Sequence, residues 1–144
     1  MKTFFPIVIL FSVMLLVGSC QEEVVVDGDD IYHSWEATTF VSVESVAYPK
    51  NEDSLIVLTF KRDGTYELKL DVNSCMGTFE RGDGDSISIS APGCTKICCD
   101  SEFSVKLAGM LPKVSSYTID ENTLQLKVEG WGFVELELVE GEND

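Results

Sequence analysis

Four cysteines in the second half of the sequence have the most distinctive spacing of its reactive side chains. Cys75 stands alone, whereas Cys94, Cys98 and Cys99 form a CxxxCC motif. An even number of cysteines in an exported domain is typical of disulfides, while four thiolates can also hold zinc. Because CxxxCC differs from the CxxC knuckle of zinc sites, we expect two disulfides, and neither a bound metal nor another cofactor.

The pairing of these cysteines is open among three arrangements. A bond between Cys98 and Cys99 would close a strained ring between neighbours, so this arrangement ranks last. Cys94 and Cys98 would lie about 13 Å apart in an extended chain, and therefore need a turn to meet. The preferred arrangement is Cys75–Cys99 with Cys94–Cys98, and the second is Cys75–Cys98 with Cys94–Cys99. Either long bond closes a loop of about 25 residues and contributes roughly 3 kcal/mol.

The other side chains offer little for catalysis. His33 is the one histidine, so a Ser-His or Cys-His nucleophile would have to use it. We expect His33 instead in an exposed turn. The sequence contains no GxSxG, P-loop, GxGxxG or HExxH motif. We therefore predict a protein that has no catalytic residues and is not an enzyme.

Acidic and aromatic residues supply the remaining binding candidates. Residues 27–30 hold three aspartates and residues 83–85 hold two, but neither stretch has EF-hand spacing or its distal glutamate. We interpret both as turns and predict no metal site. Trp131 lies between two glycines. It is either a binding residue at a barrel rim or a residue that caps the core from a turn.

Cys20 has a different context from the other cysteines. It follows an apolar run over residues 4–17 and two small residues at 18 and 19. The run is shorter than the roughly 20 residues that a membrane-spanning helix needs, and its layout is typical of a signal peptide. The stretch Val17-Gly18-Ser19-Cys20 resembles a bacterial lipobox, whose cysteine receives a diacylglyceryl group and becomes the first mature residue. The resemblance implies a signal peptide at residues 1–19 and lipidation of Cys20, and acyl chains would anchor the protein to a membrane.

The residues after Cys20 bear on localisation and domain organisation. Gln21, in place of Asp, resembles the sorting signal for the outer membrane, which implies an outer-membrane-anchored lipoprotein facing the periplasm or the surface. We interpret the acidic residues 20–30 as a tether and residues 31–140 as one domain. The formal net charge of −15 argues against nucleic acid as a partner and against electrostatic adhesion to anionic lipid.

The domain is predicted to be mainly β. Aromatic and β-branched runs, or alternating apolar and polar residues, indicate strands at 35–43, 55–60, 65–72, 77–80, 87–90, 116–120, 124–129 and 134–138. Val72 is expected to face the core, and Asp63-Gly64 predicts a hairpin. Ser101 is expected to cap a helix that buries Phe103, Leu107 and Leu111 and stops near Pro112. About eight short strands and one helix predict an α+β domain: a small antiparallel curled sheet or barrel with the helix packed on it.

The order of these features resembles the META domain family, which includes heat-shock-inducible envelope lipoproteins of the HslJ type. The resemblance rests on Trp35, Leu58-Thr-Phe60 followed by Asp63-Gly-Thr65, Asn73-Ser-Cys-Met-Gly-Thr-Phe79, Thr95-Lys-Ile-Cys-Cys99, Glu102-Phe103 with Leu107, and the terminal hairpin at Thr118-Ile119 and Leu124–Leu126. Met76 stands after Cys75 where the family has Asn, and Cys94 and Cys98 look additional. The resemblance implies a small β-rich domain linked to envelope stress, with no catalytic residues to carry over.

We therefore predict a non-enzymatic cell-envelope lipoprotein with a binding or stress-protective role. One alternative is an inhibitor or partner-binding protein that presents a loop to an envelope protein. Another is a small-molecule or glycan-binding module that uses the barrel mouth. A rigid loop near the disulfides with exposed apolar residues would favour the first alternative, and a deep pocket lined by aromatic rings would favour the second.

Overall fold

The computed structural model describes residues 30–141 of the 144-residue chain. The expected signal peptide at 1–19, the lipidated Cys20 and the tether up to residue 29 lie outside the described residues. The elements are β1 (Ser34–Ser42), β2 (Val57–Phe60), β3 (Thr65–Lys69), β4 (Ser74–Arg81), β5 (Ile87–Ile89), β6 (Gly93–Cys94), the helix α1 (Glu102–Met110), the 3₁₀ helix η1 (Leu111–Lys113), β7 (Ser116–Asp120), β8 (Thr123–Val128) and β9 (Gly132–Leu138).

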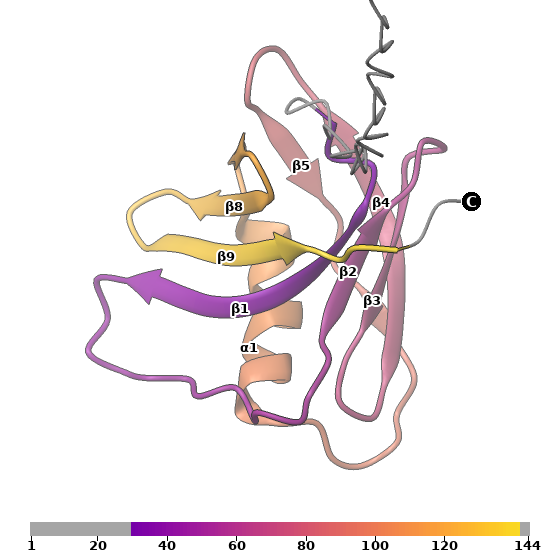
Figure 1. Ribbon diagram of the computed structural model, residues 1–144, viewed down its shortest axis with the longest axis vertical. Coiled ribbons are helices and arrows are strands. Elements are labelled where there is room, and N and C mark those ends of the chain that lie inside the picture. The colour runs from indigo at the N-terminus through magenta and orange to yellow at the C-terminus, as the bar shows by residue number, and fades with distance from the viewer. Residues whose placement is uncertain (1–29, 142–144) are drawn as a thin grey trace, which may run out of the picture.

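The nine strands of the described chain form one antiparallel sheet that curls into a nearly closed barrel (Figure 1). Their order is β5-β4-β3-β2-β1-β9-β8-β7, and β6 pairs with β4 off this path. The two ends of the order meet, because Ile87 N donates to Ser115 O (3.1 Å) and Tyr117 N donates to Asp85 O (2.9 Å). The predicted fold class is confirmed, and β6 is the strand that the sequence pattern did not indicate.

Strand β1 joins the two halves of the sheet, because it pairs with β2 on one side and with β9 on the other. Trp35 and Ala37 on this strand are fully buried, and Trp35 Nε1 donates to Ile31 O (2.9 Å). A β-bulge after Ala37 shifts the register against β9. Phe40 lies beyond the bulge and contacts the helix, with its ring centroid 4.6 Å from that of Phe103.

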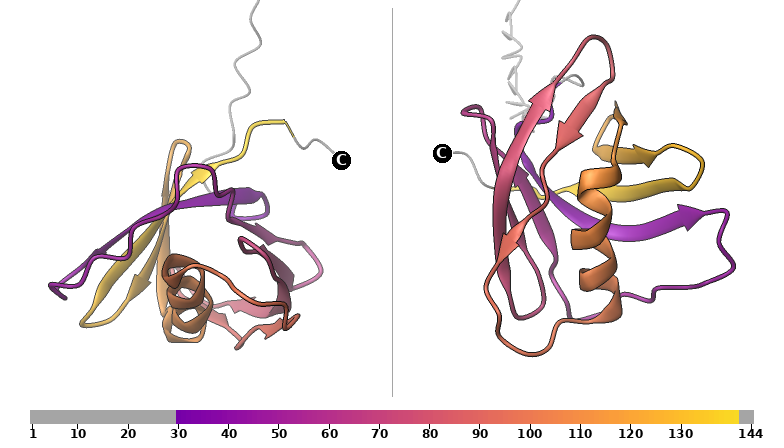
Figure 2. Two further views of the ribbon diagram at one scale, coloured as in Figure 1. Left: turned by 90° about the horizontal axis from the view of Figure 1, so that it is seen from below. Right: turned by 180° about the vertical axis from the view of Figure 1, so that it is seen from behind.

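Helix α1 lies inside the curve of the sheet (Figure 2). The Ser101 side chain accepts a hydrogen bond from Ser104 N (3.2 Å) and caps the helix, as predicted. Phe103, Leu107 and Leu111 are at most 1% exposed, so the predicted apolar stripe is also confirmed. The helix gives way to η1, which contains Pro112.

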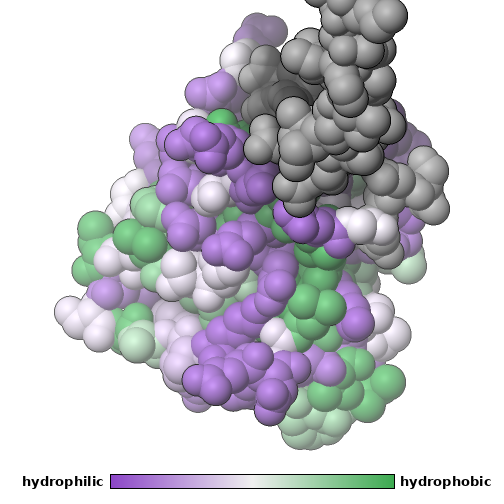
Figure 3. Space-filling model, viewed as in Figure 1, coloured by the Kyte–Doolittle hydropathy of each residue, from purple (hydrophilic) through white to green (hydrophobic). Residues whose placement is uncertain are grey.

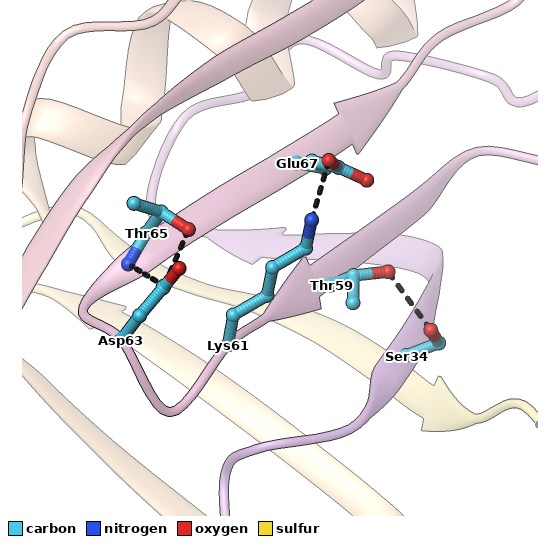
Figure 4. A network of polar contacts seen from close by, with 6 residues as sticks. All are labelled: Ser34, Thr59, Lys61, Asp63, Thr65 and Glu67. Atoms are coloured by element: carbon cyan, nitrogen blue, oxygen red, sulfur yellow. Dashed lines mark hydrogen bonds and ion pairs between the residues drawn. The ribbon is translucent and has the colours of Figure 1, made fainter. Parts of the chain in front are cut away.

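The hairpin between β2 and β3 shows how local sequence sets the register. The Asp63 carboxylate accepts hydrogen bonds from Thr65 N (2.9 Å) and Thr65 Oγ1 (2.6 Å), which fixes the predicted turn (Figure 4). Lys61 and Glu67 form an ion pair on the outward face of the same hairpin. The polar residues thus face solvent, while Phe60 and Tyr66 face the core.

The interior of the barrel is a packed core. Its largest fully buried side chains include Trp35, Phe60, Tyr66, Phe103, Leu68, Leu107, Leu124 and Leu126. The Tyr66 hydroxyl donates to Ser90 O (2.9 Å), and burial raises the pKa of this phenol to about 12. The Tyr66 ring packs directly on the backbone at Gly77, where a Cβ would lie 2.6 Å from it. Side chains are therefore closely packed in this part of the barrel.

Asp71 fastens the start of α1 to the end of β3. Its Oδ2 accepts hydrogen bonds from Ser101 N (2.9 Å), Ser101 Oγ (2.5 Å) and Ser104 Oγ (2.6 Å). Burial alone would raise the pKa of this carboxyl, but these hydrogen bonds outweigh it and hold the pKa well below its usual 3.8. A carboxylate at a helix N-terminus also interacts favourably with the helix dipole.

We predict that Asp71→Asn lowers the free energy of unfolding by roughly 1–3 kcal/mol at neutral pH, because the serine hydroxyls lose a charged acceptor. Since the folded pKa is depressed, the ionised form contributes stability above pH 3.8, and this contribution is lost as the pH falls below that value. Urea unfolding at several pH values should therefore show the gap between variant and wild type closing in acid. The control is Glu102→Gln in the exposed first turn of α1. A difference in unfolding free energy between Asp71→Asn and the wild type that stays constant with pH would contradict this role of the ionised Asp71 carboxylate.

Candidate functional site

The segment that carries three of the cysteines, residues 94–100, is here called the cysteine loop. The side chain of Asn73, only 6% exposed, holds it in place. Asn73 Oδ1 accepts from Thr95 Oγ1 (2.7 Å) and Ile97 N (2.8 Å). Its Nδ2 donates to Ile97 O (2.6 Å) and to Asp100 Oδ2 (2.6 Å). The full hydrogen-bonding capacity of one buried amide is therefore used to fix this loop.

A second set of bonds ties the far end of the cysteine loop to the same turn. Asp100 Oδ1 accepts from Val72 N (2.9 Å) and Asn73 N (3.1 Å). At the near end, Thr95 N donates to Ser74 O (3.0 Å). The loop is thus anchored at its start, middle and end, and has little conformational freedom to lose on binding.

Both predicted disulfide pairings are wrong. The structure pairs Cys75 with Cys94, whose Cα atoms are 4.0 Å apart, and bonds Cys98 to Cys99. The physical reason is strand β6, which places Cys94 directly opposite Cys75 on β4. The two remaining cysteines are then neighbours, in the arrangement that ranked last. All four cysteines are nevertheless in disulfides, as expected.

Exposed apolar side chains surround the cysteine loop. Val72 is 43% exposed, Met76 66% and Ile97 59%; we call these three residues the cysteine-loop surface. Val72 was predicted to face the core, and this is wrong, because β3 ends at Lys69 and the alternation stops there. On the space-filling view, a hydrophobic group lies at the lower right, where Figure 1 shows the loop that leads to α1 (Figure 3).

Trp131 lies in the turn between β8 and β9 and packs against the core, as the capping interpretation predicts. Its ring meets Phe40 edge to face, with the centroids 6.1 Å apart. The Lys106 ammonium lies 4.9 Å from the indole centroid and 4.5 Å from that of Tyr48, and it forms an ion pair with Glu44 (3.2 Å). The indole N–H and Lys106 together lower the pKa of Glu44, although the indole N–H does not reach hydrogen-bond geometry.

Trp131 also lines an open groove of about 600 Å³, here called the Trp131 groove, whose walls include Val43, Ser115, Ser116, Lys127, Glu129 and Phe133. The turn is fixed by Gly132, which has φ of 144° and lies against β1. A Cβ at Gly132 would be 2.0 Å from Val41 O, so only glycine allows this contact. The groove lies at the β8–β9 turn, because Glu129 and Gly130 of the turn line it together with Lys127 and Phe133 of the adjoining strands.

The remaining candidates are not brought together into a reactive site. His33 is partly buried instead of exposed, and its ring lies edge to face with Trp35 at 6.2 Å. Asp83 and Asp85 lie in the turn between β4 and β5. Within residues 30–141, no three His, Cys, Asp or Glu side chains are grouped so as to hold a metal ion. In the same part of the chain, no helix has the length and apolar character needed to cross a membrane.

Comparison with known proteins identifies the family. The sequence model of the META domain matches residues 30–137. The chain belongs to the META domain family. No curated protein matches it.

Two solved structures share the fold of this META domain protein. A DUF4847 family protein from Bacteroides vulgatus is 19% identical, with a TM-score of 0.58 over 77% of this chain and 95% of the other. A protein from Burkholderia xenovorans, solved by NMR, is 16% identical, with a TM-score of 0.63 over 76% of this chain and 83% of the other. At these identities the likeness concerns the fold alone.

The cysteines and Trp131 were visible in the sequence as candidates, but the contacts that hold them in place were not. Asn73 was noted only as part of the family motif, and its burial follows from contacts with a loop more than 20 residues away, such as that with Ile97. Lys106 and Tyr48 are separated by 58 residues, so no local pattern joins them. A signal was present for Asn73, since an Asn between two predicted strands is suited to binding backbone groups.

The disulfide between Cys75 and Cys94 predicts different outcomes for its two partners. Cys94 is exposed and Cys75 only 3% exposed. Cys94→Ser should lower the free energy of unfolding by roughly 3 kcal/mol in oxidising buffer and by nothing in reducing buffer. Cys75→Ser should cost more than Cys94→Ser in oxidising buffer and remain destabilising in reducing buffer, because it also places a hydroxyl in the core. Thermal unfolding with and without a reductant measures both, and equal losses for Cys94→Ser in the two buffers would exclude a role for the bond.

Proposed function

We propose that this META domain protein is a non-enzymatic lipoprotein of the cell envelope that binds a partner protein through its cysteine-loop surface. The lipid anchor is supported by the lipobox-like sequence at Cys20. The absence of an enzymatic role is supported by the lack of catalytic motifs in the sequence. Partner binding is supported by the geometry around Asn73.

The single observation that carries partner binding is an exposed apolar surface on a rigid support. Burying an exposed apolar side chain such as Ile97 contributes roughly 1.5–3 kcal/mol. Surface loops commonly lose that gain to the entropy of ordering. Here the buried Asn73 amide and two disulfides order the loop before any partner arrives. A loop constrained in this way is also suited to inhibitors, so an envelope protease is one kind of partner that fits.

The charge distribution supports a protein partner over a membrane surface. Asp100 beside the loop uses its carboxylate to bind the backbone of Val72 and Asn73. The apolar residues lie between one cation, Lys96, and this hydrogen-bonded carboxylate, in a chain of net charge −15. General repulsion by the rest of the protein disfavours nonspecific contact with anionic surfaces.

The lipid anchor predicts a specific mature form. In a bacterium that processes lipoproteins, the purified protein should begin at Cys20 and carry diacylglyceryl and acyl groups, so its intact mass should exceed that of the polypeptide from residue 20. Cys20→Ser should remove this added mass and move the protein from the membrane to the soluble fraction. A wild-type chain that starts at Met1 without acyl groups would overturn this part of the proposal.

Partner binding predicts that the effect of a charge depends on where it is placed. Ile97 and Val105 are matched, with 59% and 61% exposure, but Val105 lies on α1. A photo-crosslinking residue at position 97 should give a discrete adduct in envelope preparations, and one at position 105 should not.

The affinity of the Ile97→Asp variant for the captured partner, once that partner is purified, should be at least about tenfold lower than that of the wild type, a difference of 1.4 kcal/mol.

The Val105→Asp variant should bind that partner as the wild type does. Asn73→Ala, which releases the loop and leaves Ile97 intact, should also weaken binding. Equal effects of Ile97→Asp and Val105→Asp would place the interface elsewhere and refute the proposed surface.

A further inference from the structure

The Trp131 groove is lined by residues of β7, β8 and β9, by the β8–β9 turn and by Val43 just after β1. Ser116 on β7 pairs with Lys127 on β8, Lys127 pairs with Phe133 on β9, and Phe133 pairs with Val41 on β1. Directly paired residues share a face of the sheet. The groove is therefore a regular feature of the sheet, and it shares no residue with the cysteine-loop surface.

The floor of the groove is apolar and partly aromatic. Lys106 lies over the Trp131 ring and Phe40 meets its edge, so the indole is held in a fixed orientation. Val43 at the side of the groove is 81% exposed. In the space-filling view, hydrophobic residues gather at the left, where the β8–β9 turn and the end of β1 lie (Figure 3).

The rim of the groove has side-chain hydrogen-bonding groups that the described part of the chain leaves available. None of the side-chain hydrogen bonds or ion pairs formed by residues 30–141 involves Ser115, Ser116, Lys127 or Glu129. These side chains offer two hydroxyls, one ammonium and one carboxylate. A ligand that is itself rich in donors and acceptors would satisfy both kinds of group at once.

The charge of the groove narrows the class of ligand. Its lining holds one cation, Lys127, and one anion, Glu129, in a chain of net charge −15. A balanced site of this kind favours a neutral ligand over an anion or a cation. Its volume, about 600 Å³, is within the range of small-molecule sites.

We propose that the Trp131 groove binds a neutral saccharide. A pyranose ring has an apolar C–H face and a rim of hydroxyls, and this combination matches an aromatic floor with a polar rim. One ring would stack on the exposed part of Trp131 beside Val43 and Phe133. Its hydroxyls would bond Lys127, Glu129 and the two serines. The proposal does not depend on partner binding at the cysteine loop.

The test is a titration of the purified full-length protein with neutral disaccharides, namely cellobiose, maltose and N,N′-diacetylchitobiose, followed by NMR. At least one should give saturable shifts of the Trp131 indole N–H and of the amides of Ser115, Lys127 and Gly130, but not of Ile97. Digalacturonic acid, the charged counterpart, should bind at least about tenfold more weakly than that disaccharide, a difference of 1.4 kcal/mol. Because Trp35 is fully buried, a change in tryptophan fluorescence on addition of the sugar should also report on Trp131.

Variants distinguish a saccharide site from weak general binding. Trp131→Ala should reduce the affinity at least about tenfold, and Lys127→Met should also weaken binding. Trp131→Phe keeps a ring against Phe40 and should retain part of the affinity, which guards against loss of folding in the alanine variant. Val105→Ala on α1 should have no effect.

Three results would overturn the proposal. The first is the absence of saturable shifts with every neutral disaccharide. The second is binding that Trp131→Ala leaves unchanged. The third is equal affinity for the neutral and the acidic sugars, which would mean that the charge balance of the groove does not select its ligand.

Discussion

The pairing of β1 with β9 is the constraint on which the rest of the domain depends. β1 is the first strand of the described chain and β9 the last, and their ladder runs from Trp35 to Ser42. Each half of the sheet is a run of hairpins between strands close in sequence. The β1–β9 ladder is the long connection between the two halves, and a few backbone hydrogen bonds near β5 and β7 complete the closure. The core closes only when the last strand is in place, which makes the fold rich in long-range contacts.

The same ladder determines where the Trp131 groove lies. Gly132 opens β9 and lies against the backbone of Val41, so the β8–β9 turn rests on the end of β1. The bulge after Ala37 lets Phe40 reach both Phe103 and Trp131. The orientation of Trp131 is therefore a consequence of strand register, and the long segment after β1 is tied back to the helix through Glu44 and Lys106.

Much of the fold was predictable because its signals are local. Asp63 bonds Thr65 two residues away, and Ser101 caps Ser104 three residues away, so both features are visible in short stretches of sequence. The core face of α1 follows from helical spacing in the same way. The mainly β class follows from alternation, which repeats in almost every strand.

The candidate surfaces were not predictable, because long-range contacts form them. The disulfide pairing depends on β6, a strand of two residues that has no alternation to detect. Val72 fits the alternation of β3 in sequence, but its N–H bonds Asp100, 28 residues away, in a turn that ends the strand. Trp131 was visible as a candidate, whereas its neighbours Lys127 and Phe133 look like ordinary outward-facing strand residues until the register is known.

The two candidate surfaces differ from the rest of this acidic chain in the same way, namely in their charge. With 25 acidic and 10 basic residues, most of the exterior repels anionic macromolecules and is well hydrated. Both surfaces carry a cation beside their anion: the cysteine loop holds Lys96 and Asp100, and the Trp131 groove holds Lys127 and Glu129. The free-energy cost of removing water from a surface is lowest where its charges are absent or balanced. On an acidic domain, surfaces of this kind are therefore the ones suited to binding. Specificity then comes from shape at the cysteine loop, where a rigid apolar loop must find a matching pocket, and from hydrogen bonding at the groove.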